Sequence, residues 1–173
     1  FNIVVESSEN TVVTEYTSTQ KRSDNYQSEA ALEQEFIRLL REQGYEYLPI
    51  HEEKDLVNNL RCQLEELNNY KFSDPEWDDF FKKYLANPND RIVEKTYKIQ
   101  EDNIQTLTKD DGSIKNITLI DRQNIHNNKL QVINQYTVSQ QDGAKYDNRY
   151  DVTILDNGFP LVHIKLKRRG GAI

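Results

Sequence analysis

The sequence predicts an α/β domain in which helices flank a mixed β-sheet. Two observations carry this prediction. Apolar residues recur at helical spacing through the first half of the chain, and from residue 103 onward they alternate with polar residues. The clearest strand signal is a hairpin at 150–167, where two alternating runs flank a turn signal at 156–158. The length of 173 residues suits one sizeable core, so we expect a single domain over 1–173.

Three helices are expected in the first half of the chain. Ser28 is a good N-cap for the first, and Gly44 is placed to end it. The second helix covers 53–68, with leucines along one face. The third begins with a capping box at 73–76 and carries an aromatic face that we expect to pack in the core. It ends at the turn 87–89.

The strands are expected mainly in the second half. Alternating or β-branched runs separated by turn residues mark them. Outside the last hairpin, these runs cover 2–5, 11–14, 45–48, 104–108, 114–120 and 130–138. Polar loops are expected at 17–27 and 140–148. With helices early and strands late, the pattern favours one layer of sheet packed against helices.

Composition and charge exclude several classes of protein. No apolar run is long enough to cross a membrane, and a single cysteine without an export signal is typical of a cytoplasmic protein. The net charge of −7 argues against a surface coated with basic residues for nucleic acid. A local basic cluster nevertheless closes the chain, and it comprises Lys165, Lys167, Arg168 and Arg169.

The register of the last hairpin decides which residues share a face. A two-residue turn at 157–158 would mix polar and apolar residues on both faces. A longer loop, either of three residues with Gly158 in a bulge or of five residues at 156–160, shifts the register by one residue. It places Asp151 opposite Lys165 and Thr153 opposite His163. One face is then polar and the other aliphatic, so we predict the longer loop. An ion pair between Asp151 and Lys165 is possible at this spacing. The alternative is an amphipathic hairpin with a solvated charged face, in an unrelated α/β domain.

The segment 148–164 resembles the nuclease motif of the restriction (motor) subunit of type I restriction-modification enzymes. Residues 26–48, with Gly-Tyr-Glu-Tyr-Leu at 44–48, are similar to the N-terminal segment of the same family. The resemblance runs along the whole chain and is most specific at 26–48 and 147–173. It implies an endonuclease domain of the PD-(D/E)xK superfamily, hence a hydrolase that cuts double-stranded DNA.

The resemblance also implies a set of site residues. In that superfamily, an acid on one strand and an acid two residues before a lysine on the next bind Mg²⁺, which suits carboxylate ligands. Carried onto this chain, Asp151 is the first acid, Lys167 is the motif lysine, and the carbonyl of Leu166 is the backbone ligand. The expected partners are double-stranded DNA and the modification (methyltransferase) and specificity subunits, with no membrane.

Position 165 departs from this pattern, because Lys165 stands where the family carries an acid. Replacing a negative charge by a positive one beside a divalent cation removes a ligand and adds repulsion. We therefore expect weakened Mg²⁺ binding and no DNA cleavage by this chain. The alternative is a catalytically inactive module on the same fold that holds DNA or serves in assembly.

Four other polar residues were considered for the site. Glu29 and Glu33, on the first helix, are conceivable accessory acids, but we expect a helix-terminal charge and a solvated face instead. His163 lies on the polar face and is expected to pack or to lie near a phosphate. Asp156 belongs to the turn and is expected to be too distant to replace the missing acid.

The resemblance implies that this chain is the N-terminal fragment of a much larger subunit. It holds no methionine and no Gly-x-x-x-x-Gly-Lys phosphate-binding loop. We therefore expect the helicase and translocase domains, with their ATP site, to lie outside it.

Overall fold

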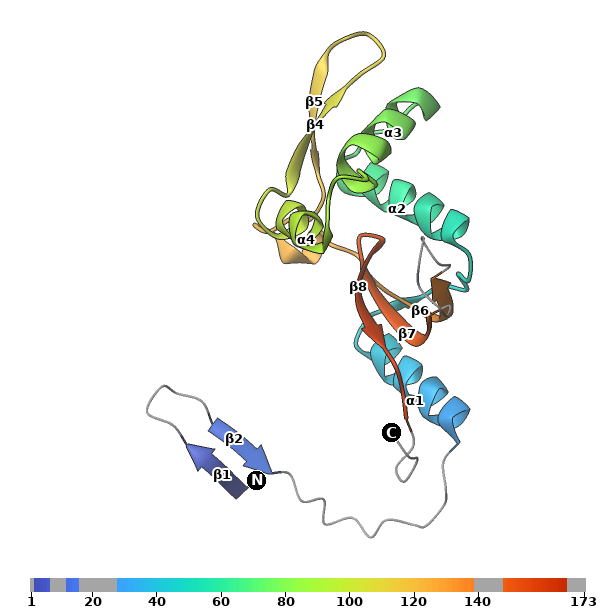
Figure 1. The fold of residues 1–173 in the computed structure, drawn as a ribbon, viewed down its shortest axis with the longest axis vertical. Coiled ribbons are helices and arrows are strands. Elements are labelled where there is room, and N and C mark those ends of the chain that lie inside the picture. Colours follow the sequence, from blue (N-terminus) through green and yellow to red (C-terminus); the bar gives the residue numbers. More distant parts are fainter. Residues whose placement is uncertain (1, 7–11, 16–27, 139–147, 168–173) are drawn as a thin grey trace.

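A computed structural model describes residues 2–6, 12–15, 28–138 and 148–167 (Figure 1). Helical elements fill most of 29–100, and they are α1 (Glu29–Glu42), α2 (Glu53–Leu67), α3 (Asp74–Phe80), the π-helix η1 (Phe81–Leu85), α4 (Ile92–Gln100) and, further along, the short 3-10 helix η2 (Ile125–Asn127). The strands are β1 (Asn2–Glu6), β2 (Val12–Glu15), β3 (Glu46–Tyr47), β4 (Ile104–Thr108), β5 (Ile114–Thr118), β6 (Leu130–Val138), β7 (Asn148–Asp156) and β8 (Phe159–Ile164).

The central element is a four-stranded mixed sheet in the order β3-β6-β7-β8. Strand β3 runs parallel to β6, whereas β6, β7 and β8 are antiparallel to their neighbours. The β4–β5 hairpin and the β1–β2 hairpin are separate two-stranded sheets. A mixed sheet flanked by helices confirms the predicted fold class and is consistent with a restriction-endonuclease-like core.

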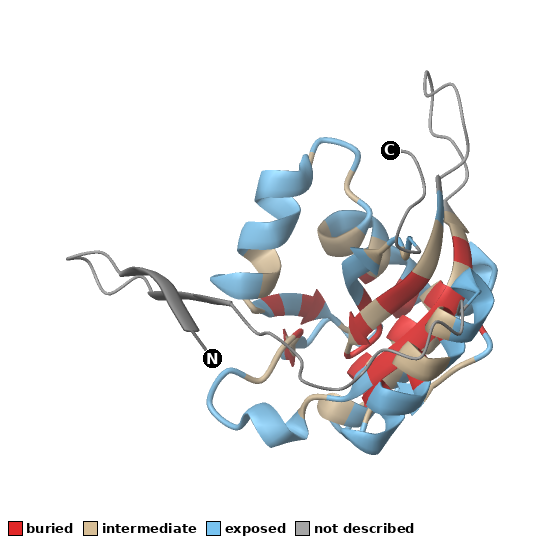
Figure 2. Cartoon of the chain, turned by 90° about the horizontal axis from the view of Figure 1, so that it is seen from below, coloured by how far each residue is buried: buried red, intermediate tan, exposed pale blue. Residues whose placement is uncertain are grey.

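Helices cover both faces of this sheet (Figure 1). On one face, Ile37 and Leu40 of α1 pack with Val132 and Val152. On the other, residues of the α2 region pack against the remaining buried strand positions, in a cluster of Ile50, Leu56, Ile133, Tyr136 and Leu155. The strands between the helices are the most buried part of the chain, as Figure 2 shows. Burial on both faces explains why β6 and β7 are rich in Val, Ile and Leu.

A third cluster joins α2, α3 and the β4–β5 hairpin. Its fully buried members include Leu64 of α2, Ile117 of β5 and Leu119 just beyond that strand. Aromatic residues of α3 complete it, because Trp77 and Phe80 are both buried against Phe72. The aromatic face predicted for the third helix is therefore core, as expected.

Local sequence signals set the helix boundaries. The Ser28 side chain accepts a hydrogen bond from the Ala31 amide at 3.1 Å and caps α1. Gly44 follows the end of that helix with φ of 95°, a conformation that favours glycine. At α3, Ser73 and Glu76 exchange side-chain hydrogen bonds with each other's backbone amides, which confirms the predicted capping box.

Two helical segments, α4 and the short η2, were not predicted. Helix α4 has no buried residue and leaves Ile92 and Val93 largely exposed, so it lacks the core-facing stripe that periodicity detects. The third helix does not end as an α-helix but continues through η1. Strand β5 ends at Thr118, two residues earlier than expected.

The predicted loop at 17–27 and most of the one at 140–148 lie outside the described residues. No helix in the described part of the chain is long and apolar enough to cross a membrane.

Candidate active site on the β7–β8 hairpin

The β7–β8 hairpin has the predicted register but a different turn. Thr153 pairs with His163, and the neighbouring positions pair as expected. The turn, however, is the two-residue Asn157-Gly158 type, with φ of 48° and 84°, so the predicted longer loop is wrong. Pairing passes from Leu155–Pro160 to Ile154–Val162, so the one-residue shift comes from a bulge at Leu161.

Close packing against α2 explains the tight turn. A Cβ atom added at Gly158 would lie 2.6 Å from the Leu60 Cα atom, a distance that only glycine allows. Asn157 is almost completely buried, and its side chain accepts from the Lys129 amide at 2.8 Å and donates to Asn128 Oδ1 at 2.8 Å. The turn is thus anchored inside the molecule, and the opposite end of the hairpin, at Asp151 and Lys165, is referred to below as its open end.

The aliphatic face of the hairpin was predicted to be sheet core, and this is wrong for β8, while the alternative of a solvated polar face does not hold at Thr153. Thr153, on the polar face, is fully buried, while Val162, on the aliphatic face, is 45% exposed. The reason is that β8 is the edge strand, whereas β7 lies between β6 and β8 with helices on both sides.

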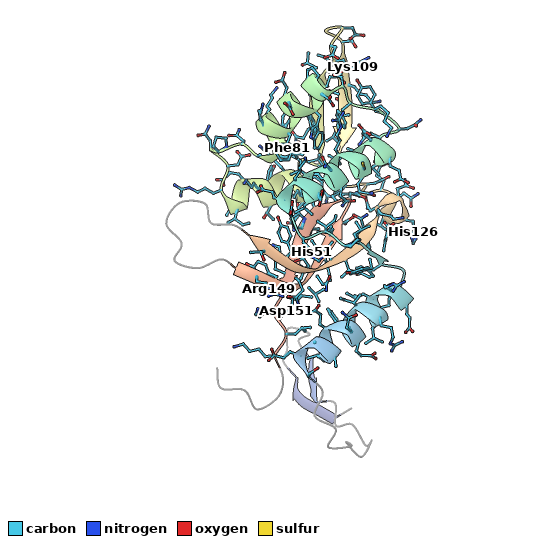
Figure 3. All side chains as sticks on the ribbon, turned by 90° about the vertical axis from the view of Figure 1, so that its right-hand side faces the viewer. His51, Phe81, Lys109, His126, Arg149 and Asp151 are labelled. Atoms are coloured by element: carbon cyan, nitrogen blue, oxygen red, sulfur yellow. The ribbon has the colours of Figure 1, made fainter. Side chains whose placement is uncertain are left out.

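The open end of the hairpin brings Asp151 and Lys165 together. Lys165 Nζ lies 3.4 Å from Asp151 Oδ1 and also donates to the Arg149 carbonyl oxygen at 3.0 Å. The Leu166 amide donates to Asp151 Oδ2 at 2.7 Å. Figure 3 shows Arg149 and Asp151 near one another on β7, far from Lys109 by the tip of the β4–β5 hairpin. The predicted ion pair is confirmed, and both oxygens of Asp151 are occupied.

His163 lies two residues before Lys165, in contact with neighbours from β7. Its Nδ1 atom is 3.0 Å from Thr153 Oγ1, and its ring stacks on Tyr150 with centroids 4.2 Å apart. Desolvation lowers the pKa of His163 below its ordinary value of 6.5. The imidazole is therefore mostly neutral at pH 7, and although His163 is exposed, its ring stacks on Tyr150 and does not present a cation to a phosphate.

The other predicted positions lie apart from this pair. Lys167 is exposed beyond β8, and Glu29 is exposed in the first turn of α1. Among the described residues, neither makes a hydrogen bond or ion pair with Asp151. Asp156 ends β7, five residues from Asp151, and its buried Oδ1 has no hydrogen-bond partner in the described part of the chain. Burial raises the pKa of Asp156.

The expectation that Glu33 lies on a solvated face is wrong. Its side chain is 6% exposed and faces the sheet from α1. Glu33 Oε1 accepts a hydrogen bond from Asn134 Nδ2 at 2.7 Å, and Oε2 accepts one from Gln135 Nε2. One signal was present in the sequence, since Glu33 falls one turn before Ile37 on the apolar side of the helix.

A family model agrees with this architecture. The model for the N terminus of the type I restriction enzyme R protein matches residues 26–173, which span the whole four-stranded sheet and the hairpin. This chain belongs to that family. The match covers far more than half of the chain, so the resemblance noted at the two sequence segments extends over residues 26–173.

Curated relatives carry the same family name. The chain is 45% identical over 171 residues to the type I restriction enzyme EcoprrI endonuclease subunit of Escherichia coli, covering 98% of this chain and 53% of that protein. It is 40% identical over 146 residues to the SsaAORF53P endonuclease subunit of Staphylococcus saprophyticus and 38% identical to the SauMSSORF170P endonuclease subunit of Staphylococcus aureus. The chain spans about half the length of the first relative and 15% of the other two.

The donor set at this site does not fit a divalent cation. Within the described residues, no group of three or more Asp, Glu, His or Cys side chains is placed to hold a metal ion. Asp151 supplies a carboxylate at the open end of the hairpin, and the Lys165 ammonium already faces it. Mg²⁺ needs several oxygen ligands and is repelled by a nearby cation, so this arrangement opposes its binding.

Proposed function

We propose that residues 26–173 form the DNA-cleavage domain of a type I restriction subunit, with its active centre at the open end of the β7–β8 hairpin. The proposed substrate is double-stranded DNA, and the proposed partners are the modification and specificity subunits of a restriction complex. The family match and the relatives named as endonuclease subunits support the assignment. The chemistry would fall to Asp151, to the residue at position 165 and to Lys167.

We further propose that Lys165 prevents metal binding at this centre, so that the chain does not cleave DNA. The single observation that carries this proposal is the 3.4 Å approach of the Lys165 ammonium to Asp151. An ammonium there neutralises the carboxylate that a metal would need, and a lysine cannot donate an electron pair from a protonated nitrogen. The hairpin keeps its fold because the Leu166 amide holds the other oxygen of Asp151.

A second function follows from the exposure of the same side chain. Lys165 is 55% exposed, and its ammonium has three N–H donors, two of which point to Asp151 and Arg149. The third has no partner among the described residues and could meet a phosphate oxygen, and the exposed Lys167 adds a second positive charge nearby in the sequence. The domain would then hold DNA without cutting it.

Cleavage assays on three forms test the proposal. The domain is carried within its full-length subunit, assembled with the modification and specificity subunits, and given supercoiled DNA, ATP and Mg²⁺. We expect no cleavage by the Lys165 form, cleavage by the Lys165→Glu form, and none by the Lys165→Gln control, which removes the charge without adding an acid. Cleavage by the Lys165 form, with no increase on Lys165→Glu, would contradict the proposal.

DNA binding distinguishes the second function. Affinity for a short duplex is measured with the Lys165 and Lys165→Gln forms at two salt concentrations. A holding role predicts weaker binding and a shallower salt dependence when the charge is removed. Equal binding by the two forms would exclude a phosphate contact by this side chain.

A further inference from the structure

Glu33 is a buried carboxylate without a cationic partner in the described part of the chain. Only 6% of its surface is exposed, and its two hydrogen-bond partners are the neutral side-chain amides of Asn134 and Gln135 on β6. Burying a charged group is costly unless it is well hydrogen-bonded. The polar contacts at Glu33 therefore call for a reason beyond ordinary packing of α1 on the sheet.

The backbone at Gln135 is the unusual feature that Glu33 contacts. Gln135 has φ of 54°, in the left-handed region that a non-glycine residue rarely adopts. Side chains on a strand normally alternate between faces. Here the adjacent Asn134 and Gln135 both reach Glu33 on α1, while Ile133 and Tyr136 belong together to the cluster on the α2 side. The alternation of β6 thus slips by one residue at Gln135.

This slip lies directly across from Asp151. The β6–β7 pairing passes from Asn134–Val152 to Tyr136–Tyr150, which places Gln135 opposite Asp151. The Asp151 carboxylate in turn accepts the Leu166 amide. Glu33 is therefore linked to the candidate active centre through one irregular backbone position, Gln135, which lies opposite Asp151 in the strand register.

The orientation of the Asn134 side-chain amide explains why position 33 needs a carboxylate and not an amide. The Tyr47 hydroxyl donates to Asn134 Oδ1 at 2.9 Å, so the Asn134 NH₂ group must point toward Glu33. Gln135 also presents its NH₂ group. Each donor meets a separate oxygen of Glu33, whereas a glutamine at position 33 would present an NH₂ group to one of them.

We propose that Glu33 is a positioning residue, which holds Gln135 in its left-handed conformation and thereby sets the Asp151 carboxylate against the Leu166 amide. Its relevance to DNA cleavage rests on the function proposed above. Glu33 itself acts through β6 and does not touch the reacting groups. A substitution that removes one acceptor oxygen should release Gln135 and shift Asp151.

Amide hydrogen exchange of the 173-residue chain tests the proposal without any need for cleavage. In the Glu33→Gln form, we expect the Leu166 amide to exchange about tenfold faster, because loss of one net hydrogen bond has roughly this effect. The Leu119 amide serves as a reference. Leu119 belongs to the third cluster, and its amide donates to the Asn103 carbonyl oxygen at 2.7 Å. Faster exchange at Leu119 by the same factor, or none at Leu166, would overturn the proposal.

Two further variants separate positioning from general destabilisation. Glu33→Gln combined with Gln135→Glu restores a donor and an acceptor in reversed places, so we expect Leu166 protection to return. Gln135→Gly accepts the left-handed backbone without help, so Glu33→Gln should have little effect on Leu166 in that background. The proposed role of Glu33 would be contradicted if the swap did not restore protection of the Leu166 amide. It would also be contradicted if Glu33→Gln sped up Leu166 exchange just as much when Gln135→Gly is present.

The link to function is measured on the Lys165→Glu form with Mn²⁺ as the probe. We expect its Mn²⁺ affinity to fall when Glu33→Gln is added and to recover in the swap. If Lys165→Glu binds no Mn²⁺, whether alone, with Glu33→Gln or with the swap, the proposed function fails. The positioning role is then still tested by the hydrogen exchange of the Leu166 amide. If Mn²⁺ binds equally with and without Glu33→Gln, the positioning role in the active centre is wrong.

Discussion

The Nζ atom of Lys165 lies 3.4 Å from Oδ1 of Asp151, across the open end of the β7–β8 hairpin. The Lys165 side chain is 55% exposed and that of Asp151 is 18% exposed, so the carboxylate is the more buried partner of the pair. The Leu166 amide holds the second oxygen of Asp151 from the hairpin backbone. The carboxylate therefore has a structural partner that does not depend on the identity of residue 165.

This difference predicts unequal effects on stability. Lys165→Ala should change the free energy of unfolding by less than about 1 kcal/mol, because exposed ion pairs contribute little. Asp151→Ala should cost about 1–3 kcal/mol, because the partly buried Leu166 amide then loses its acceptor. Urea denaturation of both variants measures the two values. A larger loss for Lys165→Ala than for Asp151→Ala would contradict this ranking.

The hairpin turn should be sensitive to a single methyl group. Gly158→Ala would force a Cβ atom against the Leu60 backbone and place a side chain at φ of 84°. We expect a loss of about 2–4 kcal/mol, which combines overpacking with an unfavourable backbone conformation. Gly112→Ala is the matched control, since φ is 79° there and nothing lies within 4 Å of the added atom. Equal losses at the two glycines would show that the close approach to α2 has no energetic weight.

Glu76 should make stability depend on pH in the acid range. Burial alone would raise the pKa of Glu76, but hydrogen bonds from the Ser73 and Asp110 amides and the Tyr70 hydroxyl hold it below its ordinary value of 4.5. A carboxyl with a depressed pKa stabilises the fold above its unfolded-state pKa, and this contribution is lost as the pH falls through the folded-state pKa. The free energy of unfolding should therefore decrease below about pH 4.5.

Glu76→Gln should lower stability at pH 7 by about 1–3 kcal/mol and flatten this acid dependence. The exposed Glu66 of α2 gives a control of the same chemistry, Glu66→Gln, which we expect to leave the acid dependence intact. Chemical denaturation across pH 3–7 compares the three proteins. An acid dependence that survives Glu76→Gln unchanged would assign it to other carboxylates.

The hairpin shows what periodicity determines and what it does not. Alternation of polar and apolar residues was sufficient to place Thr153 opposite His163. It could not distinguish a longer loop from a bulge at Leu161, because both shift the register by one residue. The choice depends on the packing of Gly158 against Leu60, a contact between residues 98 positions apart (158 − 60 = 98) in the sequence.

The same limit applies to the acid on the first helix. Ser28 and Gly44 act through their immediate neighbours, so their roles as helix-terminal residues could be predicted. The burial of Glu33 depends on Asn134 and Gln135, which the fold brings from 101 and 102 residues away. No local pattern indicates a left-handed residue within an otherwise regular strand, so Gln135 was not predicted.

The central claim is that Lys165 occupies the place of a metal ligand beside Asp151. Calorimetric titration with Mn²⁺ tests it most directly, on the chain as it stands and on its Lys165→Glu and Lys165→Gln forms. We expect binding only in the Lys165→Glu form, because that substitution alone restores a second carboxylate at the open end of the hairpin. Binding by the Lys165 form that Asp151→Ala abolishes, or no binding by the Lys165→Glu form, would contradict the claim.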